Sequence, residues 1–185
     1  MLALGIDPDL HHAGLALVES PTGGNRPKVV WTGVALAPRK LKSYAAAAAL
    51  EWPRLPWNDT DGFGRLLIGH EHTFGEVDIL VVEGQRIYPH SPVDPEDLMH
   101  LAFAAGCALQ QYQDGALAKD VPHPQQWKGS IPKPVAHARI LSRCIIIPEA
   151  AELLAGPHKS HVTDAIGLAL WGLGLPGAIQ QGRIA

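Results

Sequence analysis

The sequence predicts an α/β fold with a mixed five-stranded sheet and helices on both faces. Two observations predict this class. Five short apolar runs end in turn residues, and apolar residues recur at helical spacing between and after the later runs. The chain has 185 residues, of which 46% are hydrophobic and 18% charged, as is typical of a globular protein with one core. We therefore expect residues 1–185 to form a single domain, with a variable insertion at about residues 38–61.

Three apolar runs near the start of the chain predict an antiparallel meander. Residues 2–7 are expected to form a buried strand, and residues 14–18 return beside it after a turn at 9–12. Turn residues at 21–25 lead into a third strand at 29–36. Because the connections are short, these strands should pair with one another in chain order.

The insertion has a different composition from the strands around it. Tyr44 and the alanines at 45–49 favour a short helix, while the proline-rich stretch 52–62 is expected to be a loop. Apolar residues within positions 63–74 then fit one face of a further helix.

The second half of the chain alternates strands with helices. Residues 78–83 form the fourth predicted strand and residues 119–122 the fifth. Asp94, followed by a proline and two acids, is typical of a helix start, and we expect that helix to run over 94–112. Further helices are predicted at 134–144, 149–154 and 159–173.

Cysteine usage and the length of the apolar runs bear on where the protein works. Cys107 and Cys144 lie in apolar helical patterns without CxxC spacing, so we expect buried free thiols. No apolar stretch approaches the roughly 20 residues of a membrane span, and the chain opens on a strand pattern rather than a leader. We expect a cytoplasmic protein without a membrane partner.

Basic residues are segregated along the chain, although the net charge is −3. Residues 20–50 and 121–148 together hold nine of the 15 basic residues and no acid. Such segments suit a polyanion that binds next to an acidic site. They are equally compatible with two ordinary solvated surfaces, so charge alone leaves both readings open.

Four residues at three separate places in the chain are candidates for one metal site. Asp7 and Glu83 each end an apolar strand, and His161 and Asp164 lie three apart at the start of a helical segment. Carboxylates brought together at neighbouring strand ends repel one another unless a cation joins them. Oxygen ligands suit hard divalent ions, and a pair of such ions can support phosphodiester cleavage.

The segments that contain these residues resemble those of a known superfamily. The motifs Gly5-Ile6-Asp7-Pro8, Val82-Glu83-Gly84-Gln85 and His161-Val162-Thr163-Asp164 occur in the order seen in RNase H-like proteins. They are most similar to RuvC-type Holliday-junction resolvases, including bacteriophage versions. Residues 121–136 are also similar to the family's lysine-bearing loop, and residues 165–170 to its small-residue helix after the last acid.

The resemblance implies an RNase H-like fold and a two-metal nuclease site. It implies that two Mg²⁺ ions, replaceable by Mn²⁺, are held by Asp7, Glu83, His161 and Asp164, with Asp7 bridging the ions. Many family members have aspartate where this chain has His161, so this position departs from the common pattern. The resemblance also implies DNA contacts by Arg86, Tyr88, Lys128 and Lys133. Tyr88 would stack on bases, and Lys128 would contact a phosphate and stabilise charge on the scissile group.

Each candidate also has an ordinary structural explanation. Asp7 can open a turn before the following proline, Glu83 can be a surface residue, and Asp164 can be an acid in the first turn of a helix. Lys128 can be a solvated lysine, and Tyr88 can be a packed loop residue. These readings stay open for each residue taken alone.

Three other histidines have no role in this reading. His11 and His12 have no carboxylate or cysteine partner at metal spacing, so we expect both to be turn residues. His158 is expected to be a loop residue.

The predicted function is structure-selective, metal-dependent resolution of four-way DNA junctions by paired symmetric cleavage, in a bacterial or phage-infected cell. The helix at 94–112 is apolar on most sides, so we expect it to pack in a two-fold homodimer. Its predicted faces are Leu98, Leu101, Ala102, Ala105 and Leu109, and Met99, Phe103 and Cys107. Cleavage of other branched DNA or of RNA–DNA hybrids, and non-catalytic DNA binding on the same fold, remain alternatives.

Overall fold

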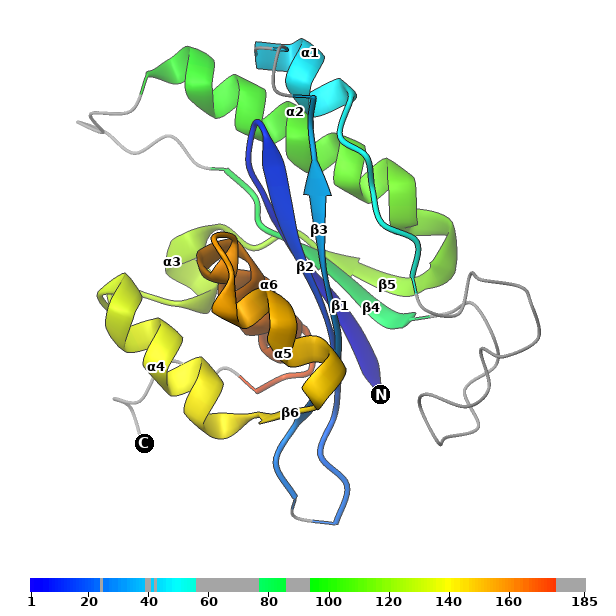
Figure 1. Cartoon of the computed structure of the whole chain (residues 1–185), viewed down its shortest axis with the longest axis vertical. Coiled ribbons are helices and arrows are strands. Elements are labelled where there is room, and N and C mark those ends of the chain that lie inside the picture. Colours follow the sequence, from blue (N-terminus) through cyan, green and yellow to red (C-terminus); the bar gives the residue numbers. More distant parts are fainter. Residues whose placement is uncertain (24, 39–40, 42, 56–76, 86–93, 176–185) are drawn as a thin grey trace.

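A mixed six-stranded sheet with the order β5-β4-β1-β2-β3-β6 forms the centre of the molecule (Figure 1). This computed structural model describes residues 1–23, 25–38, 41, 43–55, 77–85 and 94–175. The strands are β1 (Leu2–Pro8), β2 (His12–Glu19), β3 (Lys28–Leu36), β4 (Val77–Val82), β5 (Ala116–Asp120) and β6 (Ile145–Ile146).

The sheet joins an antiparallel meander to parallel strands on either side. The pairs β1–β2 and β2–β3 are antiparallel, as expected, while β4 pairs parallel to β1 and β5 parallel to β4. The prediction of five strands was wrong, because β6 adds a sixth beside β3. Its two residues are too few to produce an alternating pattern. The fifth strand also lies earlier than predicted, at Ala116–Asp120.

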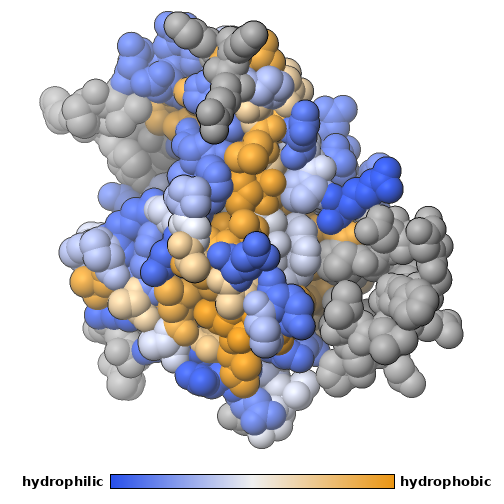
Figure 2. Space-filling view, in the orientation of Figure 1, coloured by the Kyte–Doolittle hydropathy of each residue, from blue (hydrophilic) through white to orange (hydrophobic). Residues whose placement is uncertain are grey.

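Helices cover both faces of the sheet, as predicted. They are α1 (Ser43–Ala48), α2 (Pro95–Tyr112), α3 (Pro124–Trp127), α4 (Lys133–Arg143), α5 (Pro148–Ala155) and α6 (Lys159–Gly172), with a 3₁₀ turn η1 (Gln113–Gly115). Figure 1 shows α2 on one side of the sheet and α4, α5 and α6 on the other. In Figure 2 the apolar residues form a central band with hydrophilic surface on its flanks.

Successive side chains of each strand point to opposite faces of the sheet, so a separate hydrophobic core forms on each face. Leu4, Ile6 and Leu15 point to the α2 side, and Ala3 and Ala16 point to the α6 side. The α6 side uses small strand residues, so α6 lies close to the sheet, with every residue from Val162 to Leu170 buried. This close approach positions the candidate site.

The helix α2 begins as predicted and buries most of the predicted stripe, with Leu98 and Ala105 buried and Leu101 and Leu109 half-buried. Asp94 caps it by accepting a hydrogen bond of 2.9 Å from the backbone N–H of Glu96. Ala104 and Ala108 are buried, whereas Ala102, placed by the periodicity in the core stripe, is exposed. The apolar stripe is wide enough for either face, and contact with α1 and the sheet selects the one that is buried.

The described part of the predicted insertion is packed against the domain. The short helix appears as α1, and Leu50 and Leu55 are buried in the core beside α2. The hydroxyl of Tyr112 donates a hydrogen bond of 2.7 Å to the carbonyl of Pro53. The helix predicted at 63–74 lies outside the described residues.

Both cysteines are free, as predicted, with Cys144 buried and Cys107 half-buried. Burial raises the pKa of the Cys144 thiol to about 12, so this thiol stays protonated at neutral pH. Among the described helices, none is both long enough and apolar enough to cross a membrane.

Candidate active site

Two carboxylates meet where β1 and β4 end side by side. These strands are parallel, with Ile6 opposite Val82, so the next residues along each strand are Asp7 and Glu83. The backbone N–H of Glu83 extends the pairing by donating to the carbonyl of Ile6 at 3.0 Å. Both side chains are buried, with 6% and 8% of their surface exposed. The parallel register therefore forces two acids together in a poorly solvated place.

Two glycines let α6 bring the remaining candidates to the same place. Gly5 on β1 faces the helix backbone, and a Cβ there would lie 2.6 Å from the nitrogen of Ala169. Gly14 pairs with Asp7 across β1 and β2, and a Cβ there would lie 2.6 Å from the nitrogen of Val162. Any side chain at either position would lift α6 off the sheet. The helix can therefore place His161 and Asp164 directly above the end of β1.

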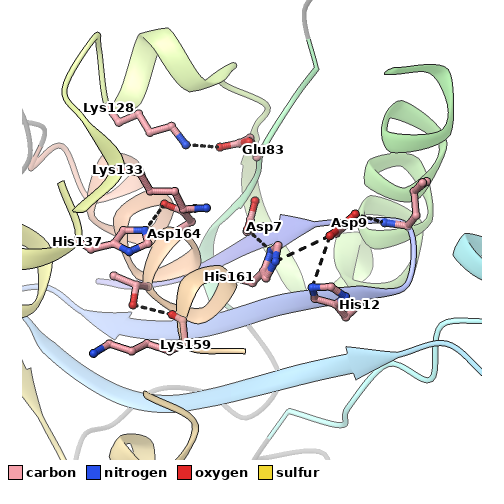
Figure 3. A network of polar contacts seen from close by, with 12 residues as sticks. Asp7, Asp9, His12, Glu83, Lys128, Lys133, His137, Lys159, His161 and Asp164 are labelled. Carbon is pink, nitrogen blue, oxygen red and sulfur yellow. Dashed lines mark hydrogen bonds and ion pairs between the residues drawn. The ribbon is translucent and has the colours of Figure 1, made fainter. Parts of the chain in front are cut away.

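The first contact of the site joins α6 to β1. Nδ1 of His161 lies 2.7 Å from Oδ2 of Asp7 (Figure 3). Burial raises the pKa of Asp7, and the hydrogen bond from His161 opposes this rise. The same hydrogen bond raises the pKa of His161, with burial of the ring opposing it. The contact thus favours an ionised Asp7 and a protonated His161, although burial disfavours the charged form of each.

Glu83 is held by the last residue of α3 and by the residue that follows it. The indole Nε1 of Trp127, which is fully buried, donates to Oε2 of Glu83 at 2.9 Å. The ammonium of Lys128 lies 3.7 Å from the same oxygen. Burial, together with the charge of Asp7, still raises the pKa of Glu83 to about 7. Lys128 and Trp127 therefore only partly offset the cost of holding a negative charge on Glu83 at neutral pH.

Asp164, unlike Glu83, has enough cationic and hydrogen-bonding partners to offset its burial. Lys133 contacts one of its oxygens at 2.7 Å, and Nε2 of His137 contacts the other at 2.9 Å. Burial alone would raise the pKa of Asp164, but the hydrogen bond from His137 and the charges of Lys128 and Lys133 hold it below its usual value. Asp164 is therefore ionised at neutral pH.

The donor set suits hard divalent cations. Asp7, Glu83 and Asp164 offer carboxylate oxygens, which Mg²⁺ prefers. The negative charges of Asp7 and Asp164 each contribute to the raised pKa of Glu83. A bound cation would offset this repulsion between the three acids. Their oxygens do not form a group lying entirely within 4.8 Å, so binding an ion there requires the like charges to draw together. The residues fit a divalent ion in their chemistry.

A second group of ligand-type side chains lies beside the first. Within the described part of the chain, Asp9, His12 and His161 are the one set of three or more whose ligand atoms all lie within 4.8 Å of one another. Nε2 of His12 is 3.5 Å from Oδ2 of Asp9. The expectation that His12 lacks a carboxylate partner was therefore wrong: the turn that joins β1 to β2 brings Asp9 back toward the first residue of β2. His158, expected to lie in a loop, is the residue that precedes α6, and its ring lies 5.2 Å from that of His12.

The other sequence-predicted residues fall into three groups. Lys128 and Lys133 lie at the site, in contact with acids. Arg86 and Tyr88 lie outside the described residues. Lys28, from the first acid-free segment, stands opposite Glu19, at the end of β2 and β3 remote from Gly14 and Asp7. Lys28, which belongs to the basic segment at residues 20–50, therefore lies away from the site.

Sequence reasoning missed two direct partners of the acids. His137 follows Lys133 by four residues, so both lie on the same face of α4 and both reach Asp164. That spacing was available in the sequence as a signal. Trp127 directly precedes Lys128 in the sequence, but nothing in the local pattern indicates that its N–H reaches Glu83, 44 positions away.

Several solved structures share this fold across nearly the whole chain. Thermus thermophilus RuvC in complex with a Holliday junction substrate matches with a TM-score of 0.59 and 18% identity, over 95% of this chain and 98% of that chain. A second Thermus thermophilus RuvC structure gives 0.51 and 19%, over 95% and 98%. The yeast mitochondrial Holliday junction resolvase gives 0.53 and 11%, over 96% of this chain and 81% of that chain.

These matches confirm the resemblance to RuvC-type resolvases at the level of the RNase H-like fold. No protein-family model matches the sequence, and no curated protein matches it either.

Proposed function

We propose that this chain is a metal-dependent endonuclease that resolves four-way DNA junctions by paired symmetric cleavage. One observation carries the proposal: the fold of junction resolvases brings three buried carboxylates, Asp7, Glu83 and Asp164, to one end of its central strands. Burying like charges costs free energy that a stability-optimised core would avoid. Such a cluster is typical of a functional site.

Asp7, Glu83 and Asp164 are the proposed holders of two Mg²⁺ ions, with Mn²⁺ as a substitute. When bound, such ions activate water and stabilise the leaving oxygen of a phosphodiester. Within the chain, Trp127 fixes one oxygen of Glu83 and leaves the other for an ion. His161 holds Asp7 in position through its Nδ1. In this arrangement His161 orients a ligand, a role it can have in addition to the ligation that the motif implies.

Lys128 and Lys133 are the proposed phosphate contacts. Both contact carboxylates of the site, and the Lys133 side chain is 46% exposed. Both ammonium groups lie next to carboxylates that would hold the ions, so a phosphate bound at the site would lie beside them. Arg86 and Tyr88 remain proposed DNA contacts from the sequence motifs alone.

The preference for four-way junctions rests on a two-fold homodimer, which we propose forms through α2. Met99 and Phe103 are 61% and 41% exposed, and Ala102 and Gly106 beside them are exposed too. Small residues among large apolar ones let a second helix approach closely. A symmetric pair of sites is what paired incision of one junction requires.

A panel of substrates tests the proposal. The purified protein is incubated with a synthetic four-way junction, a flap, a plain duplex and an RNA–DNA hybrid, each with and without Mg²⁺. We expect Mg²⁺-dependent incision at symmetric positions of the junction and little cleavage of the duplex. Faster cleavage of the flap or the hybrid would favour the alternative nucleases, and tight junction binding without any cleavage would favour the non-catalytic reading.

A further inference from the structure

The group formed by Asp9, His12 and His161 is distinct in composition from the carboxylate cluster. It offers two imidazole nitrogens and one carboxylate oxygen, whereas Asp7, Glu83 and Asp164 offer carboxylate oxygens. Two imidazoles and a carboxylate suit ions of intermediate softness such as Zn²⁺, and they suit Mg²⁺ poorly. A different ion is therefore expected to prefer each set.

The spacing of the group is close to that of a formed metal site. Oδ2 of Asp9 lies 3.5 Å from Nε2 of His12 and 3.8 Å from Nε2 of His161. Metal–ligand bonds of about 2.0–2.1 Å in a tetrahedron place neighbouring ligand atoms about 3.4 Å apart. The two imidazole rings lie side by side at 90° to each other, with centroids 4.3 Å apart. All three ligand atoms lie within 4.8 Å of one another, which is close to the spacing around a bound ion.

His161 is oriented for this role by the contact with Asp7. Its Nδ1 faces the carboxylate of Asp7 at 2.7 Å, and its Nε2 faces Asp9. A histidine ligand whose other nitrogen is held by a carboxylate is the usual outer-shell arrangement of zinc sites. All three side chains are partly exposed, between 23% and 36%, so an ion can enter from solvent.

We propose that Asp9, His12 and His161 bind one transition-metal ion of the Zn²⁺ class, at a site joined to the carboxylate cluster through His161 (Figure 3). Three protein ligands leave a fourth position open for water or for an oxygen of a bound molecule. Because the two nitrogens of one ring serve the two sets, an ion at this site fixes the imidazole against Asp7. The existence of the site does not depend on nuclease activity.

Calorimetric titration of the protein with Zn²⁺, in a buffer that contains millimolar Mg²⁺, tests the site. The visible absorption of bound Co²⁺ is a second readout. We expect one ion per chain and the absorption bands of tetrahedral Co²⁺. Asp9→Asn and His12→Ala should each lower the affinity by at least about 100-fold, because even outer-shell partners change it by roughly 10- to 100-fold. Asp9→Asn preserves side-chain shape, so it keeps the test valid if His12→Ala folds poorly.

Two matched variants separate this site from its surroundings. His11→Ala removes an exposed histidine next to His12 and should leave the affinity within about twofold of the wild type. Glu83→Gln alters the carboxylate cluster and should also retain Zn²⁺. Absence of micromolar binding, or equal binding by the wild type, Asp9→Asn and His12→Ala, would overturn the proposal. Loss of Zn²⁺ in Glu83→Gln alone would move the ion to the carboxylate cluster and equally overturn it.

Discussion

The imidazole of His161 and the carboxylate of Asp7 lie 2.7 Å apart, although 154 positions separate them in the sequence. This contact fastens the first turn of α6 to the end of β1. Both residues are held in place by the backbone around them, because Gly14 and Gly5 allow the helix to rest on the strands. The site is therefore a property of the completed fold, and changes to its charges should be visible in stability as well as activity.

Glu83→Gln should stabilise the metal-free protein while removing its activity. The folded state raises the pKa of Glu83 from 4.5 to about 7, so it binds more protons than the unfolded state in that range. Stability should therefore fall as pH rises from about 4.5 to 7, by an amount on the order of 3 kcal/mol. Glutamine lacks this penalty and keeps an acceptor for Trp127.

Thermal unfolding in a chelator at pH 5 and pH 8 checks this. The Tm of Glu83→Gln should exceed that of the wild type by roughly 5 °C or more at pH 8 and by less at pH 5. Adding Mg²⁺ at pH 8 should stabilise the wild type more than the variant. A variant less stable than the wild type at pH 8 would contradict the charge balance described for this carboxylate.

Lys133→Gln should weaken DNA binding more than Lys28→Gln does. Lys133 contacts Asp164 at the site, whereas Lys28 stands at the remote end of β3. Loss of one phosphate contact should reduce the slope of log affinity against log salt by about one. Fluorescence anisotropy with a labelled junction over a range of salt measures this slope. Equal effects of the two substitutions would remove the support drawn from the position of the lysine.

Gly14→Ala should separate α6 from the sheet. The added Cβ would meet the backbone of His161 and lie 2.6 Å from the nitrogen of Val162, and backbone atoms cannot rotate away. We expect a loss of roughly 1–3 kcal/mol in the free energy of unfolding and weaker Mg²⁺ stabilisation. Gly156→Ala is the control, because its Cβ would lie at an ordinary contact distance of 3.7 Å from the carbonyl oxygen of Leu153. Equal stability of the two variants in urea titrations would refute this packing argument.

Phe103→Glu should split the proposed dimer without unfolding the chain. Phe103 is 41% exposed, and its ring centroid lies 5.4 Å from that of Tyr44. The wild type should have twice the 19.8 kDa mass of one chain by light scattering, and the variant the mass of one chain. Gln111→Glu, an exposed change about 80° around α2 from Phe103 and away from Ala102 and Gly106, should leave the mass unchanged. A wild-type mass of one chain would remove the reason for preferring four-way junctions.

Periodicity predicted most of the fold because most elements are long enough to repeat a pattern. The strands β1 and β2 are almost wholly buried and appear as continuous apolar runs, and α2 repeats apolar residues at helical spacing, so their existence followed from the sequence. The strand β6 did not, because Ile145 and Ile146 pair with β3 through tertiary contact alone. The buried face of α2 was misjudged at Ala102 for a related reason: alanine is apolar enough for either side, and neighbouring elements decide.

The site was predictable where a strand or helix end fixed the side chain. Asp7 and Glu83 follow from two parallel strands whose acids stand at equivalent positions. Contacts that depend on the path of a connection were not predictable, since the turn after β1 brings Asp9 to His12 and the path from β5 into α3 brings Trp127 to Glu83. Those placements depend on backbone paths that no local pattern encodes.

Junction cleavage by the wild type and by Asp7→Asn, measured side by side with end-labelled four-way junction and Mg²⁺, tests the central claim most directly. The wild type should produce symmetric paired incisions that depend on Mg²⁺. Asp7→Asn should bind the junction with similar affinity, because the proposed phosphate contacts lie elsewhere, yet cut it at least about 100-fold more slowly. Cleavage by Asp7→Asn at the wild-type rate would show that the buried carboxylates are not the catalytic centre.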